Sequence, residues 1–267
     1  MEHYLRIGWA YSKMHIKKMW MFKASFVINS VALVAYFFVD FALIWVMIYA
    51  FRTMGGWNPY EIMLLFAMNL MGFSLGGFFI GHAAVKAWKE VRDGTFDDVL
   101  TKPLRTLPYL CFRELDLQSL VNVLFAAVLL CIGFGKLGTP FGPVEILKLL
   151  LGLACGGAVY AGLELFATAP IFIIRKVDSL SDMVFALRDT AKYPLSILPF
   201  VIQLIMTLFL PYAMMGYFPV QSIIGKQDYL FFGSSIRYLA PLIAFAFFAL
   251  AMWFFNFCLK RYNSTGS

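Results

Sequence analysis

Two carboxylates stand inside long apolar runs, where they are the residues best placed to do chemistry. Asp40 lies in the middle of residues 26–51, and Glu164 lies in the middle of residues 144–174. A charge at the centre of a membrane span costs about 2.5–3.5 kcal/mol, so such a residue faces protein or water, or is protonated. Both are candidates for a substrate pathway or for a helix contact. We expect no Lys or Arg at this depth, which would favour cationic or amphiphilic cargo.

Other chemistries have no support in the residue spacing. The three histidines form no HExxH or other paired-ligand pattern, and no G-x-S-x-G nucleophile turn occurs. The four cysteines lack metal-binding spacing and are predicted to be free thiols. No phosphate-binding G-x-x-x-x-G-K-[ST] loop is present, because Lys226 is followed by Gln227. We therefore expect no enzyme activity, no metal and no cofactor in this chain.

The elements that carry these residues must be membrane helices. Of 267 residues, 61% are hydrophobic and only 14% are charged, and lipid must cover that much apolar surface. The net charge of +7 lies mainly between the apolar runs, which indicates membrane topology and not nucleic-acid binding. The predicted fold class is an all-α membrane protein, built as a single transmembrane domain.

Six stretches are long enough to cross about 30 Å of hydrocarbon. They are residues 26–51, 62–82, 117–134, 144–174, 195–218 and 236–259. The two termini and the second and fourth connections then lie on one side and together carry seventeen of the 22 Lys and Arg residues. The positive-inside rule predicts a multi-pass protein with both termini in the cytosol.

Residues 1–24, before the first span, have the pattern of an amphipathic helix. Leu5, Trp9 and Ile16 recur at helical spacing, while Arg6 and Lys13 fall on another face. We predict an interfacial helix that lies along the cytosolic leaflet. A plain topology signal with anionic-lipid contacts is the alternative.

Glycine and proline mark two further features. The second and fourth predicted spans carry glycines four residues apart, which let helices approach closely, either within the chain or across a dimer. Four prolines, among them Pro211, punctuate or border residues 194–219. Because proline removes helix hydrogen bonds, we predict a broken or re-entrant element at 211–230, with an ordinary outer loop as the alternative.

Residues 88–104, between the second and third spans, are predicted to hold a short cytosolic helix. Gly94 allows a turn, and acidic residues in the first helical turn suit its positive dipole end. Phe96, Val99 and Leu100 then form an apolar face that no lipid covers, so we expect a protein partner. The docking element comprises Asp93, Gly94, Thr95, Phe96, Asp97, Asp98, Val99 and Leu100.

The second cytosolic connection, residues 175–192, repeats this design. It has one apolar stripe, made of Leu180, Met183, Val184 and Leu187. We predict a second cytosolic contact there. A helix that lies on the lipid headgroups is the alternative.

The chain resembles the membrane subunit of ABC-2-type ATP-binding-cassette exporters, specifically the bacterial ABC-2 family transporter proteins. The resemblance rests on the basic entry helix, the six spans, the loop RDGTFDDVLTKPL and the stretch PYAMMGYFPVQSIIG. It covers nearly the whole chain, and GTFDDVLTKPL is its most specific motif.

The resemblance implies a permease of the bacterial inner membrane that moves a substrate outward. ATP and Mg would be bound by a separate ATPase subunit, which docks on residues 93–100. It also implies pairing with a second permease, either an identical copy or a related chain, with membrane lipids around both and no nucleic acid.

Functions of other classes remain open from the residues alone. The main alternative is a proton-coupled secondary transporter that uses Asp40 and Glu164 as a relay. Only one predicted span is broken, whereas such carriers often show broken helices in matching positions of two repeats. A membrane enzyme or a structural membrane protein has less support.

Overall fold

The structure is a computed structural model of the chain. It describes residues 10–11, 13–14, 16–17, 20–51, 53–102, 104–139, 142–174, 186–227 and 235–263. Every regular element within these ranges is a helix, which agrees with the predicted fold class. Most of the interfacial segment 1–24 lies outside the described residues, as do Leu180, Met183 and Val184 of the second cytosolic contact.

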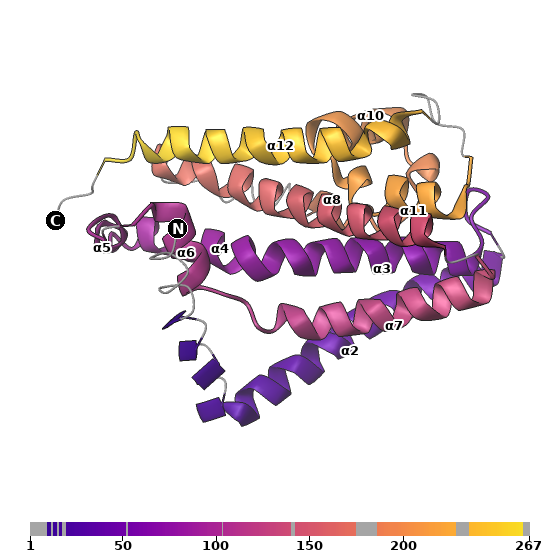
Figure 1. The fold of residues 1–267 in the computed structure, drawn as a ribbon, viewed down its shortest axis with the longest axis horizontal. Helices are drawn as coiled ribbons and strands as arrows, with labels where there is room; N and C mark the ends of the chain where they lie inside the picture. The colour runs from indigo at the N-terminus through magenta and orange to yellow at the C-terminus, as the bar shows by residue number, and fades with distance from the viewer. Residues whose placement is uncertain are drawn as a thin grey trace.

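Long helices form most of the molecule (Figure 1). They are α2 (Lys23–Phe51), α3 (Pro59–Gly76) continued by η1 (Gly77–Gly81) and α4 (His82–Arg92), α7 (Ser119–Leu137), α8 (Pro143–Thr168) continued by η2 (Ala169–Phe172), and α12 (Ile236–Leu259). The short ones are α5 (Asp97–Leu100), α6 (Thr106–Arg113), η3 (Leu195–Ile197), α10 (Phe200–Leu204), η4 (Ile205–Phe209), η5 (Tyr212–Met214) and α11 (Tyr217–Ile224).

Five helices in the described ranges are long and apolar enough to cross a membrane, and a bent pair brings the number to six if it counts as one span. That pair joins Phe200–Phe209 to Tyr212–Ile224 at an angle of 71°. The predicted span at 195–218 is therefore bent, and it is one of six spans only if the bent pair counts as a single span. The break falls at Pro211, whose ring nitrogen has no hydrogen to donate, and the expected broken element does occur in this region.

The long helix that starts at Pro59 has a strong sequence signal at its first turn. The Asn58 side chain accepts a hydrogen bond from the Glu61 backbone N–H, and the Glu61 carboxylate accepts one from the Asn58 N–H. This capping box satisfies two N–H groups that the helix leaves free. From there the helix continues through η1 to Arg92, ten residues beyond the predicted end at His82.

Glycines bring α3 and α8 into close contact at the centre of the bundle. A Cβ atom on Gly72 would lie 2.9 Å from the Gly156 Cα, and one on Gly76 would lie 2.6 Å from the Gly157 carbonyl oxygen. No larger residue fits at either position without moving backbone. The glycine pattern in the sequence therefore serves packing within the chain.

Helix α2 stands apart from this bundle. Figure 1 shows α2 diverging from α3 and α4 toward the end where α2 begins. Only 6% of its best membrane-spanning window is buried inside the chain. The rest of its apolar surface must be covered by lipid or by another protein.

The two ends of the bundle differ in charge. We call the end where α2 begins, α4–α6 lie and α12 finishes the basic end. The described Lys and Arg residues at this end include Lys23, Lys86, Lys89, Arg92, Lys102, Arg105, Arg113, Lys260 and Arg261, and those at the opposite end include Lys136, Lys148, Lys226 and Arg237.

Candidate functional site

The segment 93–100 projects from the basic end as a tight turn followed by α5 (Figure 1). Gly94 adopts a φ of 74°, which side chains with a Cβ disfavour, so glycine permits the turn after α4. The Glu90 carbonyl oxygen then accepts hydrogen bonds from the N–H groups of Thr95 (2.9 Å) and Phe96 (3.2 Å). These bonds hold the start of α5 against the last turn of α4.

The apolar face of this segment is only partly free. Phe96 is fully buried, and its ring lies 5.1 Å from that of Phe172 and 5.4 Å from that of Tyr262. Val99 is also buried, whereas Leu100 is 45% exposed. The expectation that Phe96 and Val99 insert into a partner is wrong, because both pack inside their own chain.

What remains on the outer surface of the segment is mainly polar. Asp93, Thr95 and Asp98 are exposed beside Leu100, and Asp97 is half-buried. The N-cap position of α5 is Phe96, and no side chain caps this helix. The free surface thus combines one apolar side chain with carboxylates.

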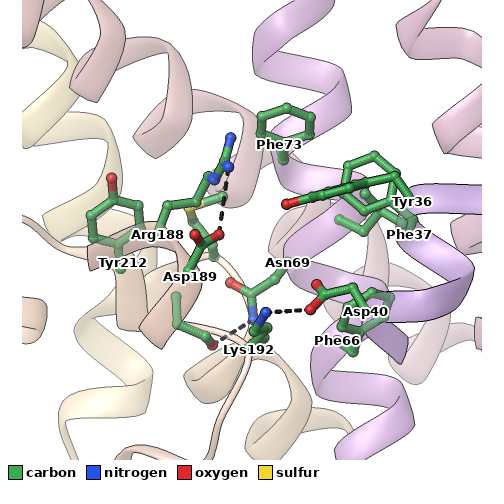
Figure 2. Close-up of a pocket in the computed structure, with 13 residues that line it drawn as sticks. Tyr36, Phe37, Asp40, Phe66, Asn69, Phe73, Arg188, Asp189, Lys192 and Tyr212 are labelled. Carbon is green, nitrogen blue, oxygen red and sulfur yellow. Dashed lines mark hydrogen bonds and ion pairs between the residues drawn. The ribbon is translucent and has the colours of Figure 1, made fainter. Parts of the chain in front are cut away.

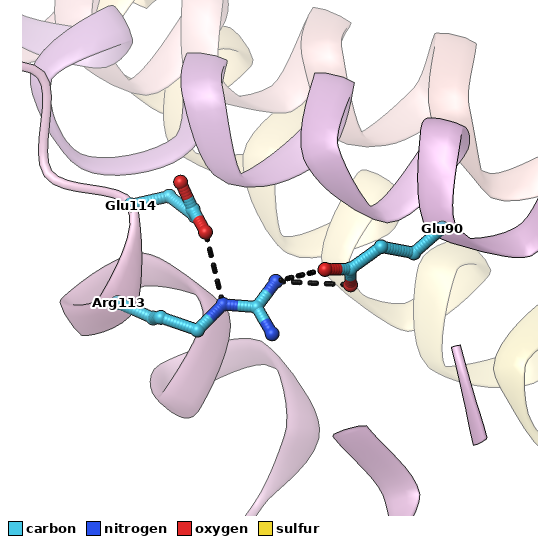
Figure 3. Close-up of polar contacts among 3 residues, drawn as sticks. All are labelled: Glu90, Arg113 and Glu114. Carbon is cyan, nitrogen blue, oxygen red and sulfur yellow. Dashed lines mark hydrogen bonds and ion pairs between the residues drawn. The ribbon is translucent and has the colours of Figure 1, made fainter. Parts of the chain in front are cut away.

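A charged clamp fixes the base of this segment. The Arg113 guanidinium on α6 donates to both carboxylate oxygens of Glu90 on α4, at 2.8 and 2.9 Å, and to Glu114 at 3.0 Å (Figure 3). Burial alone would lower the pKa of Arg113, but the two carboxylates raise it above its ordinary value. Two nitrogens of one guanidinium thus link Glu90 on α4 and Glu114 at the end of α6 by charge-assisted hydrogen bonds, which are stronger than neutral ones.

A separate cluster of polar side chains lies at membrane depth. It surrounds a cavity of about 50 Å³ between α2, α3 and residues 188–192 (Figure 2). Asp40 is the eighteenth of the 29 residues of α2, about 25 Å along it. Its carboxylate forms an ion pair with the ammonium group of Lys192. The two side chains are only 21% and 17% exposed.

Lys192 reaches this depth because the segment that carries it folds between the helices. The Asn69 side-chain N–H of α3 donates to the Ala191 carbonyl oxygen at 3.0 Å, and the Arg188 guanidinium lies over the Phe73 ring at 5.1 Å. Leu187 packs against the same core. Residues 187–192 are therefore not a cytosolic connection, and the expectation that no basic residue lies at the depth of Asp40 is wrong.

Sequence reasoning missed Lys192 and Arg188, because it assigned them to a loop by their position between two apolar runs. Asn69 and Asp40 in neighbouring spans could have indicated that a polar segment lies between them, because buried polar groups require partners. A paired carboxylate does not by itself indicate cationic cargo.

Glu164 is buried at 4% exposure on α8, one turn after the buried Tyr160. Glu164 does not line the cavity around Asp40. The two candidate pathway residues therefore do not share this cavity. With room for only a few water molecules, the cavity is closed to a substrate in this conformation.

Comparison with known proteins gives one match. A family model described as ABC-2 family transporter protein matches residues 33–266, which is most of the chain. No curated protein and no solved structure matches.

Proposed function

The chain belongs to the ABC-2 family transporter proteins, and we propose that it is the membrane-spanning permease subunit of an ATP-binding-cassette exporter. In this proposal a separate subunit binds and hydrolyses ATP with Mg. The permease works beside a second copy of itself or a related permease in the bacterial inner membrane.

The observation that carries the proposal is the way segment 93–100 is attached. Its free side bears Asp93, Asp98 and Leu100, while Phe96 on its inner side is held between Phe172 and Tyr262. Phe172 ends η2, and Tyr262 follows α12. A movement of this segment would therefore be transmitted to the ends of α8 and α12 as well as to α4.

This attachment is what a coupling element needs. A short helix that was loosely tethered would absorb the motion of an ATPase by bending its own connections. Here two backbone bonds to Glu90, the Arg113 clamp and the aromatic contacts of Phe96 oppose such bending. We therefore place the ATPase contact on Asp93, Thr95, Asp98 and Leu100, with Phe96 and Val99 as the internal anchor.

The excess of basic residues at this end supports its assignment to the cytosol, with both termini on that side. Labelling of single cysteines with a membrane-impermeant maleimide tests the orientation. Asp98→Cys should react only when the reagent reaches the cytosolic face, and Lys226→Cys only from outside. The opposite result would reverse the proposed topology and remove the docking site from the ATPase side.

Pairing of Asp40 with Lys192 weighs against a proton relay shared with Glu164. A relay requires groups that exchange protons along one path, and Glu164 lies outside the cavity that Asp40 lines. The ion pair instead supports a role for Asp40 as a contact between α2 and residues 187–192.

The test of the proposed function is purification of the tagged chain from its native cell in mild detergent, followed by mass spectrometry of the proteins that accompany it. We expect an ATP-binding-cassette ATPase, and we expect the double variant Asp98→Ala/Leu100→Ala to lose it. Lys260→Ala, an exposed change elsewhere at the basic end, is the matched control and should retain it. Recovery of the chain without any ATPase would refute the proposal.

A further inference from the structure

A second and larger cavity lies between α2, the η1–α4 junction and the start of α7. Its volume is about 430 Å³, within the range of small-molecule binding sites. It is lined by α2, by Phe73 and His82 of the long α3–α4 helix, and by Asp116, Gln118, Ser119 and Asn122 at the start of α7. Neither the proposed coupling nor the Asp40 ion pair uses it.

The lining is polar at one end and apolar at the other. His82 lies 23 residues after Pro59, about 35 Å along the helix, beyond roughly 30 Å of hydrocarbon. Asp116 precedes α7 at the same end. Phe73, Ala32 and Leu33 form the apolar end, toward the middle of the membrane. This is the profile of an amphiphile that lies with its headgroup at the basic end.

A hydrogen-bonded carboxylate organises the polar end. Asp116 Oδ2 accepts a bond from the Ser119 hydroxyl, and Asp116 Oδ1 accepts one from the Gln118 backbone N–H at 2.9 Å. His82 Nδ1 lies 3.4 Å from the same Oδ1. Burial alone would raise the pKa of Asp116, but the bonds from His82, Ser119 and Gln118 lower it below its ordinary value. The polar end of the cavity therefore holds a carboxylate, with His82 as its neighbour.

Two buried polar atoms in the same lining lack a partner among the described residues. They are the side-chain nitrogen of Gln118, a donor, and the side-chain oxygen of Asn122, an acceptor. Asn122 is only 3% exposed. A buried polar atom without a hydrogen bond costs about 1–3 kcal/mol, so these two atoms indicate an occupant that offers both an acceptor and a donor.

We propose that this cavity binds a membrane amphiphile whose zwitterionic headgroup carries a primary ammonium group beside a phosphate, as in an aminophospholipid. The ammonium donates to the Asn122 side-chain oxygen and to Asp116. The phosphate accepts from the Gln118 side-chain amide and from His82. The alkyl chains lie along Ala32, Leu33 and Phe73, in the space that the divergence of α2 leaves.

This headgroup chemistry sets an order of preference. A trimethylated ammonium has no N–H to donate to Asn122, and a headgroup with net negative charge meets the carboxylate of Asp116. Phosphatidylethanolamine should therefore bind more tightly than phosphatidylcholine or phosphatidylglycerol with the same chains. The proposal does not require an ATPase, so it stands or falls separately from the proposed function.

The test is native mass spectrometry of the delipidated chain, purified in mild detergent and incubated with each of the three palmitoyl-oleoyl lipids in turn. We expect one phosphatidylethanolamine per chain, held about tenfold more tightly than the other two, which corresponds to about 1.4 kcal/mol. Equal retention of all three lipids, or of none, would overturn the proposal.

Two adjacent positions on α2 provide a matched pair of variants. Ala32 lines the cavity and Val31, 64% exposed, does not. Ala32→Trp should fill the cavity and abolish the preference for phosphatidylethanolamine, and Val31→Trp should leave it intact. If Ala32→Trp keeps the preference for phosphatidylethanolamine, or if both variants lose it, the lipid does not bind in this cavity.

A third variant separates binding from folding. Asn122→Leu keeps the approximate volume and removes the unpartnered acceptor, so the thermal stability of the lipid-free chain should stay equal or rise. The preference for phosphatidylethanolamine over phosphatidylcholine should disappear. A variant that melts normally and keeps the preference would exclude Asn122 from the site and overturn the assignment.

Discussion

The ion pair between Asp40 and Lys192 should be among the strongest single links between α2 and the rest of the chain. Because α2 is barely buried elsewhere, we propose to remove each charge in turn, with Asp40→Leu and Lys192→Met, and then to remove both. Each single variant leaves one charge without its partner in a mostly apolar cavity.

The expected loss of stability in each single variant follows from the burial of the ion pair. Both side chains are less than a quarter exposed, and removal of one member of a buried pair typically costs about 3–5 kcal/mol. At about 2–4 °C per kcal/mol for a chain of this size, each single variant should melt about 6–20 °C lower. Replacement of both charges by apolar groups is often neutral, so the double variant should melt near the original temperature.

The assay is thermal unfolding of the purified protein in one mild detergent, followed by intrinsic fluorescence. Lys148→Met is the control, because the Lys148 side chain is 38% exposed and lies 3.9 Å from Glu145, and a solvent-accessible pair of this kind contributes only about 0.2–1 kcal/mol. Single variants that melt normally, or a double variant whose loss equals the sum of the single losses, would refute the reasoning that the two charges stabilise each other.

Three further predictions concern packing and pH. Gly76→Ala should lower the melting temperature strongly, because the new Cβ would lie 2.6 Å from the Gly157 carbonyl oxygen. Gly135→Ala is the control and should be neutral or slightly stabilising, because no atom lies within 4 Å of its Cβ position. Equal effects of the two variants would contradict the close crossing of α3 and α8. Phe96→Ala should cost about 3–5 kcal/mol of unfolding free energy in thermal melts, and Leu100→Ala, 45% exposed, should cost far less; a stable Phe96→Ala protein would return Phe96 to the partner-facing surface. Asp116 has a lowered pKa in the folded chain, so its stabilising contribution is complete above the ordinary carboxyl pKa and disappears as the pH falls through the lowered folded value. Asp116→Asn should therefore flatten the loss of stability below about pH 4, and an unchanged acid profile would argue against a charged Asp116.

The sequence by itself determined the class of the protein. Apolar runs of about 20 residues can exist only as membrane helices, because backbone groups in lipid must be hydrogen-bonded within the segment. The glycines at 72, 76, 156 and 157 indicated close helix packing, and Pro211 indicated a break, since both effects are local properties of the backbone. The turn at Gly94 and the short helix α5 were also expected from local signals, chiefly Gly94 itself and the acidic residues after it.

Tertiary structure alone decided which side chains of these elements are free. Phe96 is buried because Phe172 and Tyr262, distant in the sequence, meet over it. Lys192 lies at membrane depth because Asn69 and Asp40 hold its segment between the helices. The cavity beside α2 exists because that helix diverges from α4 (Figure 1). Periodicity and hydropathy report how a segment prefers to fold, but the partner that covers each face is a property of contacts between segments.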